Sequence, residues 1–192
     1  MKKLLIGLLL ALAILALAWW LGNLQRGTLL DDLERKGRQE LDLYVSHLSG
    51  QLNRYAFLPA LLADDFRLQS LLLAPGNVDQ QDQVNRFLGH VNTSAGSLDV
   101  YLMDATGLTL AASNWQDERT FVGQNFGFRP YFIDAMQGEP GRYYALGTTS
   151  GRRGYYFSHP VGDPEEPQGV VVVKIDIETF ENNWRGGDTE LV

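Results

Sequence analysis

The chain opens with an uninterrupted apolar stretch. Residues Leu4 to Gly22 are 19 consecutive apolar or small residues without a charge, which at about 1.5 Å per residue suffices to cross a hydrocarbon core of about 30 Å. We therefore predict a transmembrane anchor in residues 1–27. A cleaved signal peptide is the alternative, because Ala16-Leu17-Ala18 has the small-x-small pattern of a cleavage site. Trp19 and Trp20 suit a membrane interface and favour the anchor.

Helical periodicity follows the apolar stretch. Between residues 28 and 57, apolar or small side chains recur every three to four residues, the spacing of one helix face; they are Leu30, Leu33, Gly37, Leu41, Tyr44, Leu48, Leu52 and Tyr55. Residues 61–73 predict a second, shorter helix and residues 80–93 a third. The apolar stripe of the long helix either packs against the domain's own sheet or forms a homodimer contact, and both options stay open.

Short β-rich runs replace this pattern after Ser94. Residues 98–103 and 108–112 flank Asp104-Ala105-Thr106-Gly107, whose turn-forming residues predict a hairpin. A short helix is expected at the segment from Pro130 to Met136, and three further strands are expected at residues 142–148, 155–161 and 170–177. This order of elements predicts an α+β fold, in which helices flank an antiparallel sheet.

Composition and charge exclude several functional classes. The chain has no cysteine, which excludes disulfide scaffolds and cysteine nucleophiles. It carries 16 Lys and Arg against 23 Asp and Glu, and this acidic balance disfavours a nucleic-acid partner. His47, His90 and His159 lack metal-ligand spacing, and no standard catalytic or phosphate-binding motif is present. We therefore assign no catalytic residue, metal or cofactor to this chain; a small anchored hydrolase is the alternative that a turnover assay would test.

One lysine lies within the most apolar of the predicted strands. Lys174 shares a strand face with Val170, Val172 and Asp176. A buried ammonium without a partner costs several kcal/mol. Lys174 is therefore expected at a sheet edge, paired with Asp176, or in contact with a ligand.

Other polar residues could form an anion site with this lysine. Arg129 precedes Pro130 at the start of the predicted short helix, and its planar guanidinium suits a carboxylate, although an ion pair with a nearby acid is the alternative. Thr148 and Ser150 offer two hydroxyl donors or act as turn formers. Arg129 and Lys174 together would select a small dianion over a monoanion by about 1–3 kcal/mol. Aromatic residues would form the walls of such a pocket; the cluster comprises Phe126, Phe128, Tyr131, Phe132, Tyr143, Tyr144, Tyr155, Tyr156 and Phe157.

Several ordered motifs resemble those of one family. They are Leu52-Asn53-Arg54-Tyr55, residues 58–63, Tyr101-Leu102-Met103-Asp104, Ala112-Ser113-Asn114-Trp115, Phe121-Val122-Gly123 and residues 128–132, 145–151 and 153–158. Together they resemble the extracytoplasmic sensor of DctB-type C4-dicarboxylate sensor histidine kinases. The resemblance implies a PAS-like (double Cache) sensor whose membrane-distal module binds succinate, fumarate or malate.

The resemblance also implies the ligand-binding residues. The family holds the ligand carboxylates with an arginine, the hydroxyls of a T-x-S stretch and a lysine, which match Arg129, Thr148, Ser150 and Lys174. The list of expected ligand-binding residues is completed by two aromatic residues, Tyr131 and Phe126. Phe126 stands where a tyrosine is often found, so the ligand preference is left open.

The resemblance further implies an organisation and a set of partners. We divide the chain into the anchor (1–27), stalk and packing helices (28–74), the PAS-like ligand-binding module (75–180) and the start of a linker to a second module (181–192). The expected setting is the bacterial inner membrane, with the sensor in the periplasm and a homodimer formed through the stalk helix. ATP and a cognate response regulator would engage a kinase domain outside this chain. A chemoreceptor or a diguanylate cyclase carrying a similar sensor is the alternative.

Overall fold

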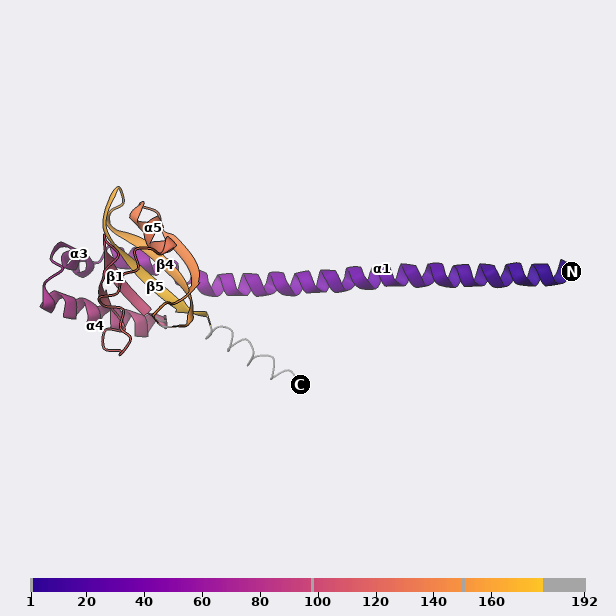
Figure 1. The fold of residues 1–192 in the computed structure, drawn as a ribbon, viewed down its shortest axis with the longest axis horizontal. Helices are drawn as coiled ribbons and strands as arrows, with labels where there is room; N and C mark the ends of the chain where they lie inside the picture. The colour runs from indigo at the N-terminus through magenta and orange to yellow at the C-terminus, as the bar shows by residue number, and fades with distance from the viewer. Residues whose placement is uncertain (1, 98, 150, 178–192) are drawn as a thin grey trace. The chain divides into compact units, whose positions relative to one another are not determined.

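The computed structural model describes residues 2–97, 99–149 and 151–177 (Figure 1). Its contacts divide the chain into two units, Met1–Ser49 and Gly50–Val192. Helix α1 (Lys2–Asn53) accounts for the described residues of the first unit, and its last turn belongs to the second unit. The helical periodicity predicted from residue 28 onward falls in α1 as far as Asn53. Within the described residues no helix combines the length and hydrophobicity that a membrane span requires, so the structure does not support the transmembrane helix of the fold prediction.

Three helices begin the second unit. They are α2 (Leu58–Ala63), α3 (Phe66–Leu73) and α4 (Val78–Ala95). The single helix predicted for residues 61–73 is wrong, because Asp65 is extended and caps a new helix: its carboxylate accepts the Arg67 backbone N–H at 2.9 Å. Helix α4 begins at the Asn77 cap and ends at Gly96, whose φ of 65° is left-handed.

The remaining elements form one antiparallel sheet and a short helix. The strands are β1 (Asp99–Asp104), β2 (Thr109–Ala112), β3 (Gly141–Leu146), β4 (Arg153–Asp163) and β5 (Glu166–Asp176), and α5 is Pro130–Met136. The strand order is β2-β1-β5-β4-β3, with every neighbouring pair antiparallel. The α+β prediction is therefore confirmed. Because β5 is the central strand, the alternative that places Lys174 at a sheet edge is wrong.

The two faces of β5 serve different parts of the core. Val170 and Val172 belong to an aromatic-rich cluster that includes Tyr131, Phe132 and Ala135 of α5. Helix α5 therefore covers this face, whereas α3 and α4 lie on the other side of the sheet (Figure 1). Side chains alternate along a strand, so Lys174 points to the α5 face together with Val170 and Val172.

Candidate ligand-binding site

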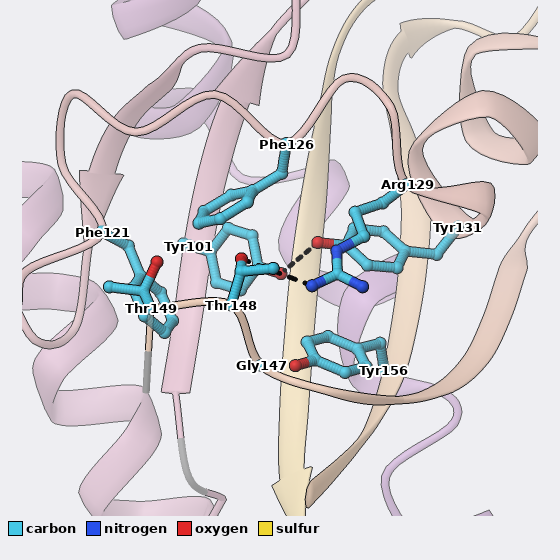
Figure 2. Close-up of a pocket in the computed structure, with 9 residues that line it drawn as sticks. All are labelled: Tyr101, Phe121, Phe126, Arg129, Tyr131, Gly147, Thr148, Thr149 and Tyr156. Carbon is cyan, nitrogen blue, oxygen red and sulfur yellow. Dashed lines mark hydrogen bonds between the residues drawn. The ribbon is translucent and has the colours of Figure 1, made fainter. Parts of the chain in front are cut away.

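A small pocket lies on the α5 face of the sheet (Figure 2). Its walls come from β1, the segment that precedes α5, the start of α5, the loop after β3, and β4; the lining residues are Tyr101, Phe121, Phe126, Arg129, Tyr131, Gly147, Thr148, Thr149 and Tyr156. Four of the six predicted site residues, namely Phe126, Arg129, Tyr131 and Thr148, are thus brought together. Ser150 lies outside the described residues.

Arg129 occupies the N-cap position of α5. Its backbone is extended (φ −76°, ψ 138°), and Pro130 at the first helical position has the φ that begins a helix. The guanidinium donates hydrogen bonds to the Leu146 carbonyl oxygen at 3.2 Å and to the Thr148 hydroxyl at 3.4 Å. Within the described part of the chain it forms no ion pair. Among the described residues the Arg129 guanidinium therefore contacts neutral acceptors, at the end of β3 and in the loop that follows it.

Tyrosine hydroxyls face the guanidinium from the sheet and from α5 (Figure 2). The hydroxyls of Tyr101 and Tyr131 share a hydrogen bond of 2.8 Å, and each residue is only 1% exposed. Tyr131 also stacks on Tyr156, with ring centroids 5.1 Å apart. Burial raises the pKa of Tyr101 and of Tyr131, and raises that of Tyr156 to about 12. All three phenols are therefore neutral near pH 7 and can donate hydrogen bonds to an anion.

Phenylalanine rings close the other side of the pocket. Phe121 meets Tyr101 edge-on at 5.3 Å between centroids, and Phe126 lies 5.7 Å from Phe121. The space left for the centres of water-sized spheres is about 10 Å³, roughly what one water needs. A larger organic ligand therefore enters only when the walls move apart, and Thr148, on the loop after β3, is the exposed residue among those that line the pocket.

Lys174 lies one layer behind the pocket and does not line it. The side chain is fully buried, with its ammonium 5.3 Å from the Phe121 ring centroid and 5.9 Å from that of Tyr156. The Nζ atom pairs with a carboxylate oxygen of Asp99 at 3.4 Å. Asp176, the partner considered from the sequence, forms an ion pair with Arg152. Lys174 therefore does not line the pocket beside Arg129 in this conformation, and its ammonium is paired with an internal acid. That the two cations hold opposite ends of one ligand stays a prediction.

Burial controls the ionisation of the Asp99–Lys174 pair. Loss of hydration raises the pKa of Asp99 to about 6, although the nearby ammonium of Lys174 acts in the opposite direction. Burial likewise lowers the pKa of Lys174, against the effect of Asp99. In both groups desolvation therefore outweighs the mutual attraction.

Sequence reasoning did not assign Asp99, Tyr101 or Phe121 to the site, although Tyr101 and Phe121 stand in the family motifs. Asp99 and Tyr101 lie on β1. Asp99 reaches Lys174 because these two residues are partners in the register of β1 with β5. No local signal reveals that register. The alternation of Asp99, Tyr101 and Met103 along the strand could have placed the first two on one face, but not which face of the sheet that would be.

The five-stranded antiparallel sheet flanked by helices, with a polar and aromatic pocket on one face, is like that of a Cache sensor domain. The chain is 39% identical over 184 residues to the C4-dicarboxylate transport sensor protein DctB of Pseudomonas aeruginosa, and 37% identical over 160 residues to the protein of that name from Rhizobium meliloti. These matches support a DctB-type sensor fragment, as the motifs predicted.

A solved structure supports the same assignment. The sensor domain of the V. cholerae histidine kinase DctB matches with a TM-score of 0.77 and 42% identity, over 80% of this chain and 60% of that domain. The alignments cover 96% and 83% of this chain but only 30% and 26% of the two relatives. The chain thus spans less than a third of the length of these relatives, and the similarity concerns that part alone. No family model matches the chain.

Proposed function

We propose that the pocket binds a C4-dicarboxylate such as succinate, fumarate or malate, and that the chain is the ligand-sensing part of a two-component sensor histidine kinase. The observation that carries the proposal is the Arg129 guanidinium, which points into a pocket that carries several hydroxyl donors and is closed by aromatic rings (Figure 2). The relatives are named as C4-dicarboxylate transport sensors, which supports this ligand class.

The first carboxylate would bind at Arg129. A carboxylate can accept two parallel hydrogen bonds from a guanidinium, and it would replace the long contacts of 3.2 and 3.4 Å to Leu146 and Thr148. The Thr148 hydroxyl would then donate to the ligand. Ser150, which follows on the same loop, is proposed as a further donor from the sequence motif alone.

The second carboxylate would bind toward Lys174. Phe121 and Tyr156 separate the ammonium from the pocket, so these rings must shift as the ligand enters. A ligand that binds this widened form more tightly than the closed one shifts the population toward it. That differential affinity is the source of the signal.

The proposed setting is the bacterial inner membrane, with the sensor domain in the periplasm. The uncharged residues 4–22 support an anchor, and the exposed side chains Leu41, Tyr44 and Val45, which share one face of α1, support a homodimer contact. The signal would pass to an ATP-dependent kinase domain outside this chain and from there to a response regulator. We assign no cofactor to the chain itself.

Titration calorimetry on the full chain tests the ligand assignment. Succinate should bind, and butyrate, a four-carbon monocarboxylate, should bind at least about tenfold more weakly, because it cannot satisfy both cations. Arg129→Ala should weaken succinate binding by about tenfold to a hundredfold, the loss expected for one charged hydrogen-bonding group.

The matched control is Arg142→Ala. Arg142 is an exposed arginine of β3 that lies over Phe157 and outside the pocket, so its loss changes the net charge equally and should leave succinate affinity unchanged. Equal affinity for succinate and butyrate, or an Arg129→Ala variant that binds like the unaltered chain, would contradict the proposal. Circular dichroism checks that each variant is folded.

A further inference from the structure

The Asp99–Lys174 pair lies directly behind the proposed ligand pocket. Asp99 of β1 faces Lys174 of β5 in register, and both are buried, with exposed fractions of 8% and 0%. The lysine ammonium lies near the rings of Phe121 and Tyr156, which are two walls of the pocket. Two residues that line the pocket therefore also lie beside the ammonium of this ion pair.

The ion pair is loose for a buried one. Its N–O distance is 3.4 Å, whereas charge-assisted hydrogen bonds of this type are usually about 2.7–2.9 Å. Gly154 makes room for the lysine side chain at this position, because a Cβ there would lie 3.0 Å from the Lys174 Cε atom. A competing carboxylate that approached Lys174 more closely would thus displace Asp99 at little cost.

We propose that Asp99 holds Lys174 in the ligand-free sensor and yields it to the second carboxylate of the ligand, taking up one proton from solvent as it does so. This inference rests on the proposed function. Two carboxylates beside one ammonium in a dry site repel each other, and one of them is then neutralised by protonation. Protonated Asp99 keeps its place as a neutral hydrogen-bond donor, so the fold is preserved while the lysine changes partner.

Charged groups around the ion pair also act on the pKa of Asp99. After burial and Lys174, the groups that act on the pKa of Asp99 are Asp117, which raises it, and Arg152, which lowers it. Arg152 precedes β4 and pairs with Asp176 of β5, which itself acts on Lys174. Tyr156 of β4 has its pKa raised by burial to about 12 and stays neutral. The pKa of Asp99, about 6, lies near the physiological range, and its carboxylate is the one in contact with the lysine.

Succinate affinity measured against pH tests the proposal. Above about pH 6.5 the dissociation constant of the full chain should rise by up to about tenfold per pH unit, the slope for uptake of one proton. Calorimetry in buffers of different ionisation enthalpy should give about one proton taken up per succinate near pH 7.5. Asp99→Asn should bind succinate with an affinity that does not change with pH, and without proton uptake.

Asp117→Asn is the matched control. Asp117 is an exposed acid near the pair, so its removal should leave both the slope and the proton uptake in place. If Asp99→Asn does not fold, the proton uptake of the unaltered chain decides alone. Succinate binding that depends on Arg129 but shows no pH slope and no proton uptake would overturn this inference and leave the proposed function intact. A folded chain that does not bind succinate at any pH would overturn both.

Discussion

The hydrogen bond between Tyr101 and Tyr131 gives the sharpest test of the pocket as the structure shows it. The two hydroxyl oxygens are 2.8 Å apart, both residues are 1% exposed, and neither hydroxyl forms another hydrogen bond within the described residues. Tyr101→Phe therefore removes one hydrogen bond and leaves the Tyr131 hydroxyl buried without a partner. Such a group usually costs about 1–3 kcal/mol.

The size of the pocket lowers the upper end of this expected cost. Its free space of about 10 Å³ is roughly the room one water requires, and such a water would satisfy the orphaned hydroxyl. We therefore expect a loss of free energy of unfolding of about 1–2 kcal/mol for Tyr101→Phe, and a similar loss for Tyr131→Phe. Removing both hydroxyls leaves no orphan, so the double variant should lose less than the sum of the two single losses.

Urea unfolding, monitored by tryptophan fluorescence, measures these losses. An unchanged slope of the free energy of unfolding against urea concentration shows that only stability has changed. The coupling energy between the two positions should be about 1 kcal/mol. Tyr155→Phe is the matched control, because Tyr155 of β4 contacts Phe157 and forms no hydrogen bond through its hydroxyl within the described chain; its loss should stay below about 0.5 kcal/mol. Strict additivity of the single losses would refute the proposed pairing of the hydroxyls.

Two further predictions concern Asn85 and Gly141, which lie outside the pocket lining. The same urea titration tests both. Asn85 of α4 is 4% exposed and accepts the Ala112 backbone N–H at 2.9 Å, so Asn85→Ala should cost about 1–3 kcal/mol by orphaning that N–H; no measurable loss would mean that another group accepts this N–H. A Cβ at Gly141 would lie 2.6 Å from the Tyr131 carbonyl oxygen, so Gly141→Ala should force β3 and α5 apart at a cost of about 1–3 kcal/mol. Gly76→Ala, which would meet nothing within 4 Å, is its control, and equal stability of the two alanine variants would contradict the close packing of α5 on β3.

Local patterns in the sequence are sufficient to predict most of the elements. The helical spacing from residue 28 onward falls within α1, and the runs at residues 98–103 and 108–112 fall within two residues of β1 and β2. Pro130 marks the start of α5, and its neighbour Arg129 lines the pocket. These features are local, because they depend on side-chain periodicity and on the backbone preferences of single residues.

Only the tertiary structure decided which side chains come together at the pocket. Asp99 and Lys174 are 75 positions apart in the chain, and they become partners because β5 lies between β1 and β4 in the sheet. The sequence by itself determined that Lys174 needs water, a carboxylate partner or a ligand, since an isolated buried ammonium in an apolar strand is too costly. It could not determine that Asp99 is that partner, or that Phe121 and Tyr156 screen the lysine from Arg129, because strand order and register follow from the packing of the whole sheet.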